Sequence, residues 1–242
     1  MNDRMLGASY HSFGPNFRMT LALVGAGGLF CWLAYEAAVE FHERIAWIVF
    51  YVLSVGFGLL AALHLSFRVW VHEGGLVCRG LFVRNTIPWR EISRIYFASY
   101  DIHAHYVALG TFYRLRLTTK HGKNLSIGER LHGAKDLSEL IQSYTLAEML
   151  QKAKHEFENG AELDFERIRI SRKAGVKYHK WFRWHEIRWQ DLTAYGVSDS
   201  HVNLSGARKL FKVNIPAEKV ANTHVLKEIL DQVRAAKLRV GF

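Results

Sequence analysis

Two long apolar stretches decide the architecture of this chain: residues 19–35, MTLALVGAGGLFCWLAY, and residues 45–67, IAWIVFYVLSVGFGLLAALHLSF. Neither contains Asp, Glu, Lys or Arg. A helix needs about 20 consecutive apolar residues to cross a bilayer, and both stretches have aromatic ends, as membrane helices do. We therefore predict two transmembrane helices, 19–35 and 45–67, joined into a hairpin by the short loop 36–44. The alternative is a pair of helices buried in a soluble core.

Charged residues around the hairpin predict its orientation. The loop 36–44 carries one arginine and three glutamates. Cytoplasmic flanks of membrane helices are enriched in Lys and Arg, so we expect the loop outside and both chain termini in the cytoplasm. The arginines that border the hairpin on the cytoplasmic side are Arg4, Arg18, Arg68, Arg79 and Arg84.

The remainder of the chain is strongly basic. Residues 68–242 hold 29 of the 32 Lys and Arg side chains and 18 of the 22 acidic ones, a net charge of +11. A basic region tethered to a membrane is attracted to anionic lipid by about 1 kcal/mol for each basic residue near the surface. The charge therefore predicts contact with anionic head groups; solubility and orientation alone are the alternative.

A duplicated unit follows the hairpin. The segment IPWREI, residues 87–92, matches IRWQDL, residues 187–192, at an offset of 100. Ile127, Leu137 and Ile141 match Ile215, Val225 and Ile229 at an offset of 88, because the first copy has the extra segment 101–112. Each copy is expected to run from short strands to a closing helix, at about 134–158 and 223–237. We predict an N-terminal segment 1–18, the hairpin 19–67, a first unit 68–159 and a second unit 160–242.

A family resemblance rests on three pieces of sequence. GLVCRGLFVRNTIPWREI (75–92) and VKYHKWFRWHEIRWQDL (176–192) resemble the bacterial pleckstrin-homology-like (PH-like) domain, and VNIPAEKVANTHVLKEIL (213–230) resembles its ending. The whole chain is similar to uncharacterised bacterial membrane proteins with tandem PH-like domains behind a transmembrane hairpin. The resemblance implies an α+β fold in which each unit is a bent antiparallel sheet or barrel with a C-terminal helix. It also implies a multi-pass protein of the bacterial inner membrane.

The sequence offers no recognisable catalytic, cofactor-binding or metal-binding motif. His103 and His105 would share one side of a strand, but two ligands without a third convergent group do not make a metal site. We expect Trp89 and Trp189 to anchor the core rather than bind a ligand. No recognition helix for nucleic acid is evident. The expected protein is therefore neither an enzyme nor a nucleic-acid binder.

Two basic clusters are the candidate site for anionic head groups. The resemblance places the first in the leading hairpin of the second unit, where head-group-binding PH domains carry basic residues; a solvated face is the alternative for both. We expect a membrane-anchored, non-enzymatic interaction or scaffold protein, with anionic lipid, an unidentified protein or a second copy of the chain as partner. The alternative function is a membrane signalling protein that senses a small ligand or nucleotide. The candidate residues are Arg167, Arg169, Arg172, Lys173, Lys177 and Lys180, and Arg114, Arg116, Lys120 and Lys123.

Overall fold

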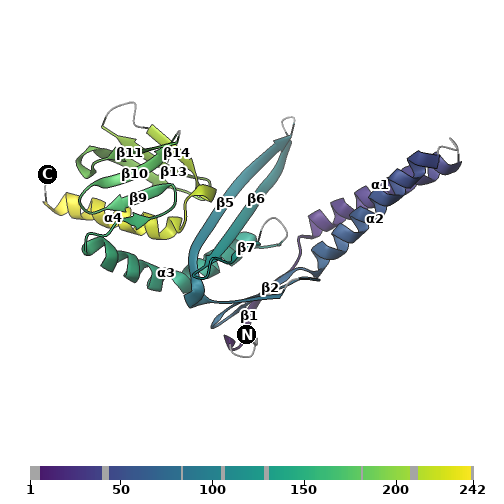
Figure 1. Cartoon of the computed structure of the whole chain (residues 1–242), viewed down its shortest axis with the longest axis horizontal. Coiled ribbons are helices and arrows are strands. Elements are labelled where there is room, and N and C mark those ends of the chain that lie inside the picture. Colours follow the sequence, from purple (N-terminus) through teal and green to yellow (C-terminus); the bar gives the residue numbers. More distant parts are fainter. Residues whose placement is uncertain are drawn as a thin grey trace. The chain divides into compact units, whose positions relative to one another are not determined.

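The computed structural model describes residues 6–39, 44–82, 84–104, 107–127, 131–180, 182–207 and 212–240. In this part of the chain, four α-helices and four antiparallel sheets form a mixed α+β structure (Figure 1). The α+β class is therefore confirmed, whereas none of the described sheets closes into a barrel. The chain forms two compact units: Met1–Pro88 with Glu129–Gly133, and Trp89–Gly128 with Ala134–Phe242.

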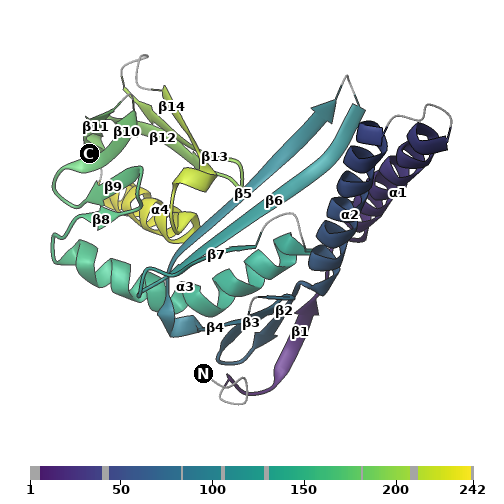
Figure 2. The same ribbon diagram turned by 45° about the vertical axis from the view of Figure 1, so that its right-hand side comes forward.

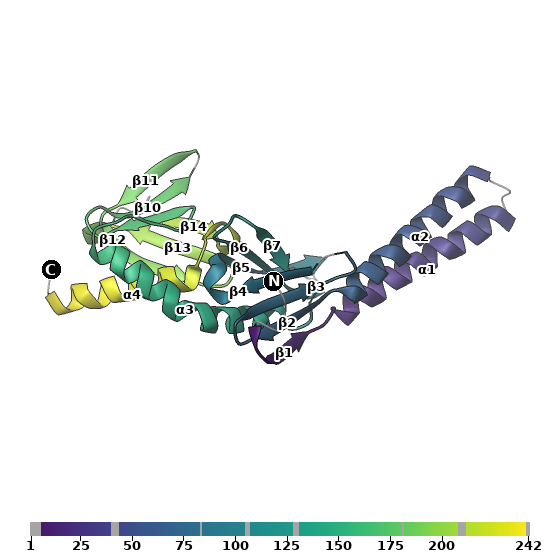
Figure 3. The ribbon, with the colours of Figure 1, turned by 60° about the horizontal axis from the view of Figure 1, so that its bottom comes forward.

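The first unit contains the two apolar helices, α1 (Phe17–Val39) and α2 (Arg44–Ser66), which lie side by side (Figures 1 and 3). Gly27 is buried between them, and its carbonyl oxygen accepts a hydrogen bond of 2.9 Å from Ser54 Oγ. Most of the remaining apolar side chains on both helices are exposed, so a soluble core does not bury them. Both helices are long and apolar enough to span a membrane.

The helix pair is inserted between two strands that are bonded to each other. Strand β1 (Ser9–Phe13) precedes α1 and pairs with β2 (Arg68–His72), which follows α2; Phe13 lies opposite Val69. Strands β3 (Gly75–Arg79) and β4 (Arg84–Pro88) complete a four-stranded sheet in the order β1-β2-β3-β4 (Figure 2). The sequence predicted no strand before the first helix, because SYHSF is short and its partner lies about sixty residues further along the chain.

We expect a soluble protein when α1 and α2 are removed and Asn16 is joined to Phe67 through an Asn-Gly turn, because β1 then stays paired with β2. A fragment that starts at residue 68 should be less stable by several kcal/mol. This fragment lacks β1, so the edge of β2 beside the buried Val69 and Val71 is unpaired. Each backbone hydrogen bond lost lowers the free energy of unfolding by about 1 kcal/mol. Urea unfolding of both proteins measures the difference. Equal unfolding midpoints would show that β1 contributes nothing.

The second unit begins with a three-stranded sheet and a long helix. Strands β5 (Ile92–Ala104), β6 (Val107–Thr119) and β7 (Asn124–Ile127) follow a single 3₁₀ turn at Trp89–Glu91. The backbones of β5 and β6 stay paired as far as Ala104 and Val107, so the extra segment 101–112 lengthens this hairpin, as predicted. Helix α3 (Ala134–Glu158) buries Leu137 and Ile141, the residues that match Val225 and Ile229 of the second copy.

The described residues in the rest of the second unit include seven short strands and helix α4 (Thr223–Val240). The core beneath them contains Ile168, Ile170, Val176, Leu204 and Leu226, all buried, and the C-terminal half of α3 packs against it. The strands form two sheets, β11-β10-β9-β8 and β12-β13-β14 (Figure 3). Their bounds are β8 Leu163–Asp164, β9 Ile168–Ser171, β10 Gly175–Lys180, β11 Arg183–Ile187, β12 Leu192–Val197, β13 His201–Gly206 and β14 Lys212–Pro216.

Strand pairing repeats along the chain as the predicted duplication requires. Leu76 lies opposite Ile87 in β3–β4, and Val176 lies opposite Ile187 in β10–β11. A 3₁₀ turn follows each pair, and the register then shifts at the same point, at residues 92–94 and 192–194. Each copy thus has four meandering strands, three more and a helix, and the first copy contains the helix pair between its first two strands. The boundaries 68–159 and 160–242, which the sequence predicts for the two copies, stay a prediction.

Candidate functional site

The predicted cluster on β6 lies beside acidic residues that follow in the sequence. Arg114 Nη1 lies 3.3 Å from Glu218 Oε2, and Arg116 Nη2 lies 3.8 Å from Glu166 Oε2. The Arg116 guanidinium also sits 3.9 Å from the centre of the Tyr96 ring. These arginines therefore already have acidic and aromatic partners within the second unit, although both keep part of their surface exposed.

The two lysines of this cluster, Lys120 and Lys123, lie just beyond the C-terminal end of β6. Lys120 Nζ is 3.9 Å from Glu148 on α3, and Lys123 is exposed in the β6–β7 turn. Exposed ion pairs at this distance contribute little to stability. The structure thus divides the four residues into an arginine pair facing Glu218 and Glu166 and a lysine pair near the turn.

The arginine pair lies beside a contact between strand β5 of the first copy and the segment before α4 in the second copy. Asn222, just before α4, donates its backbone N–H to the Ile95 carbonyl oxygen at 2.7 Å. Its side chain accepts from Ile95 N at 2.8 Å and donates to Ser93 O at 3.1 Å. Tyr100 donates a hydrogen bond to Glu218, and burial together with this bond raises the pKa of Tyr100 to about 12. This part of the basic surface thus joins the two copies.

The predicted cluster in the second copy is spread along one β-hairpin. Arg169 and Lys177 lie opposite each other on β9 and β10. Lys177 Nζ is 2.8 Å from Glu162, while Arg169 is 3.7 Å from Glu162 and 3.5 Å from Asp164. Two acidic side chains therefore balance the two basic ones at the centre of the cluster.

The remaining members of this cluster lie on either side of that centre. Arg172 and Lys173 are exposed in the β9–β10 turn, and Arg172 donates to the Glu158 carbonyl oxygen at 3.3 Å. Arg167 contacts His179. Lys180 lies at the far end of β10, opposite Arg183. The structure does not gather the six residues into one cradle for a phosphate group.

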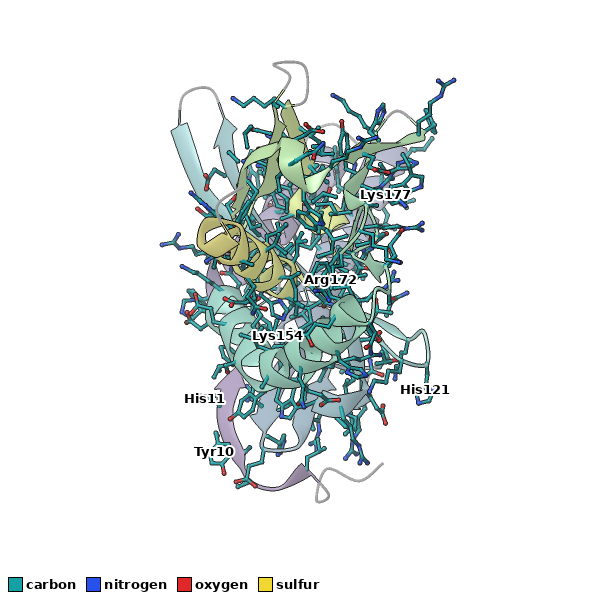
Figure 4. The ribbon with its side chains drawn as sticks, turned by 90° about the vertical axis from the view of Figure 1, so that its left-hand side faces the viewer. Tyr10, His11, His121, Lys154, Arg172 and Lys177 are labelled. Carbon is teal, nitrogen blue, oxygen red and sulfur yellow. The ribbon has the colours of Figure 1, made fainter. Side chains whose placement is uncertain are left out.

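A groove lies between α3 and α4 in the second unit. It has a volume of about 380 Å³ and is lined by apolar side chains of both helices and by Lys154, Glu158 and Arg172. Figure 4 labels Lys154 and Arg172 there, together with Lys177 on β10. A groove with two cations and one carboxylate at its rim could accommodate a small anionic molecule.

Trp89 and Trp189 take the structural positions that the sequence predicts for them. The Trp89 ring stacks on Tyr144 of α3 at 4.9 Å, and the Trp189 ring meets Phe157 of the same helix edge-on at 6.3 Å. Trp189 Nε1 also donates to the Ser171 carbonyl oxygen at 2.9 Å. Both rings therefore pack α3 against the turns that follow β4 and β11.

Sequence reasoning missed two features of the structure. The hairpin tips carry Phe82 and Phe182, which are 82% and 94% exposed and stand 100 residues apart; the repeat offset could have found them. His224 is largely buried in the first turn of α4, and its Nε2 has no hydrogen-bond partner among the described residues. Burial lowers the pKa of His224 to about 4, so the ring is neutral at pH 7.

The described residues contain no group of three or more His, Cys, Asp or Glu side chains that could hold a metal ion. The His103 and His105 side chains lie outside the described part of the chain. The absence of an enzymatic activity therefore stays a prediction.

Comparison with known proteins places the chain in a family but assigns it no activity. No curated protein and no solved structure matches it. A family model described as "Family of unknown function (DUF6585)" matches residues 1–239, which is almost the whole chain. The chain therefore belongs to the family of unknown function DUF6585.

Proposed function

We propose that this protein is a membrane-anchored, non-enzymatic interaction protein whose two PH-like units engage anionic lipid head groups at the cytoplasmic face of the bacterial inner membrane. One observation carries the proposal. The two exposed apolar helices leave from between the paired strands β1 and β2, and the adjoining end of that sheet is lined with arginine.

The arginines form one row across three strands. Arg68 on β2 lies opposite Arg79 on β3, and Arg79 lies opposite Arg84 on β4; all three are exposed. Exposed arginines beside the end of a membrane helix are attracted to anionic lipid head groups. Arg68 comes two residues after the end of α2, which places the row at head-group depth when α2 spans the bilayer.

The PH-like assignment is supported by the order of the strands. Residues 163–240 run as four antiparallel strands, three antiparallel strands and a helix, and the first copy follows the same order around its inserted helices. This order of strands followed by a helix supports the fold that the sequence resemblance implies. The acidic loop between the helices and the arginine row at their other end favour cytoplasmic termini.

The test uses the soluble protein in which an Asn-Gly turn replaces α1 and α2. We expect it to sediment with anionic vesicles and not with neutral ones, and to dissociate as salt rises, because exposed charges are screened beyond about 10 Å at 0.1 M ionic strength. Changing Arg68, Arg79 and Arg84 together to Gln should weaken binding by about tenfold or more. The matched control changes three exposed lysines on α3 and α4, Lys135, Lys152 and Lys227, to Gln.

Two results would contradict the proposal. Equal binding to neutral and anionic vesicles would remove the head-group role, and equal losses in the two triple variants would show that total charge matters rather than the row. Binding to neither vesicle, with capture of one defined membrane protein by the intact chain, would favour the protein-partner alternative.

The groove between α3 and α4 favours a second candidate function, the sensing of a small anionic ligand or nucleotide. Lys154 and Arg172 lie on its rim above the apolar surface of Phe157, Ile229 and Val233. A thermal-shift screen with phosphorylated metabolites, repeated with Arg172→Gln, tests it. A flat response in both proteins would count against this function.

A further inference from the structure

Two hairpin tips stand out because each presents a phenylalanine to solvent. Phe82 lies between β3 and β4, and Phe182 lies between β10 and β11. A largely exposed phenylalanine leaves an apolar ring in water, and burial of that ring is favourable. Because an exposed phenylalanine occurs at the same position of both copies, we expect an apolar partner to cover these rings.

The first tip is held against the end of a membrane helix. The Leu81 N–H donates to Ser66 Oγ at 3.0 Å, and Ser66 is the last residue of α2. A side chain at Gly80 would touch the Phe67 ring at 3.4 Å, so the loop lies close to the helix end. Leu81 is 56% exposed beside Phe82. A spanning α2 has a candidate membrane segment of 22 residues, and at about 1.5 Å per residue it crosses the hydrocarbon layer and brings this tip to the interface.

The second tip repeats the chemistry of the first. Lys180 lies opposite Arg183 at the base of the tip, as Arg79 lies opposite Arg84. Phe182 has a φ of 65°, a conformation that few residues other than glycine adopt without strain. The neighbouring Trp184 is 40% exposed, with the Arg169 guanidinium 4.4 Å from its ring centre. An aromatic tip between two cations matches a bilayer interface, where rings lie among acyl chains and cations meet phosphates.

We propose that the β10–β11 tip is a second bilayer-inserting element, in which Phe182 enters the interface and Lys180 and Arg183 bind lipid phosphates. This inference rests on the proposed function, and it adds that the second copy touches the membrane through this tip rather than through the β9–β10 turn. The β9–β10 turn has Arg172 and Lys173 but no exposed aromatic ring.

The experiment uses the full chain in nanodiscs of neutral or anionic lipid, with both native cysteines, Cys31 and Cys78, changed to Ala. An environment-sensitive fluorophore is attached to a single cysteine at position 182, at position 82 or at the exposed Lys227 of α4. We expect lipid-borne quenchers to reduce the emission at 182 and at 82 several-fold more than at 227. Lys180→Gln with Arg183→Gln should weaken the quenching at 182 and leave that at 82 unchanged.

A second measurement avoids the attached fluorophore. Hydrogen exchange at the β10–β11 tip should be several-fold slower in anionic than in neutral nanodiscs for the unlabelled chain. Phe182→Asn, which tolerates the same backbone conformation, should abolish this difference without changing the thermal stability. The β6–β7 turn around Gly122 serves as the internal control.

The outcomes separate the two proposals. Quenching at 82 but not at 182, with no change in exchange at the β10–β11 tip, would overturn this inference and leave the proposed function standing. Protection of position 182 only when other membrane proteins are present would also overturn it, in favour of a protein contact. A failure of the vesicle test together with no quenching at either tip would instead overturn the proposed function.

Discussion

Replacement of Gly175 by alanine is expected to lower the free energy of unfolding of the second unit by about 3 kcal/mol or more. A Cβ atom at this position would lie 2.3 Å from the Ile187 carbonyl oxygen and 2.9 Å from Arg188 Cα. Both are backbone atoms, so β10 and β11 would have to move apart. The φ of 112° adds strain for any residue with a side chain, beyond the cost of overpacking.

Thermal and urea unfolding of the intact protein, followed by tryptophan fluorescence, measure this loss. Gly196→Ala is the matched control, because Gly196 also lies in a strand of the second copy but has only Asn203 Cβ near it, at 4.0 Å. We expect the control to change stability by less than about 0.5 kcal/mol. Gly75→Ala should resemble Gly175→Ala, since its Cβ would lie 2.3 Å from the Ile87 carbonyl oxygen. Equal stability of the Gly175 and Gly196 variants would contradict the close backbone approach.

Replacement of Asn222 by alanine is expected to cost about 3 kcal/mol and to loosen the edge of β5. The change removes two side-chain hydrogen bonds, to Ile95 N and Ser93 O, at about 1 kcal/mol each and more where the backbone group stays buried. Asn222 also has a φ of 50°, which alanine adopts at an extra cost of about 1 kcal/mol.

Two further variants separate these causes. Asn222→Gly removes the same hydrogen bonds without the backbone strain, so we expect a smaller loss than with alanine. Asn214→Ala, at an exposed position of β14, is the control and should be close to neutral. Hydrogen exchange at Ile95 is the direct measurement: unchanged protection in Asn222→Ala would show that the loop before α4 does not hold β5.

Local patterns made the helices predictable. The two apolar helices follow from unbroken runs without charge, and α3 from the spacing of Leu137 and Ile141. The repeat was also visible, because the tryptophans that precede β5 and β12 stand in similar segments at an offset of 100. The extra segment in the first copy lengthens a hairpin, as its position in the alignment of the copies predicted.

The basic clusters show the limit of composition. Arg114 and Arg116 count as free cations in the sequence, yet Glu218 and Glu166 lie beside them although they are far along the chain. Lys177 likewise meets Glu162. A charge count contains no information on such distant partners, because ion pairs depend on distances that only folding sets.

The sequence alone therefore determined the apolar helices, the order of strands and helices after them and the excess of positive charge, because these depend on neighbours within a few residues or on a repeat offset. Only the tertiary structure decided that β1 closes the sheet across the inserted helices and that Asn222 holds β5. It alone also decided that the Phe82 and Phe182 side chains are exposed. Strand pairing and exposure depend on which distant segments fold against each other, and no local pattern records that choice.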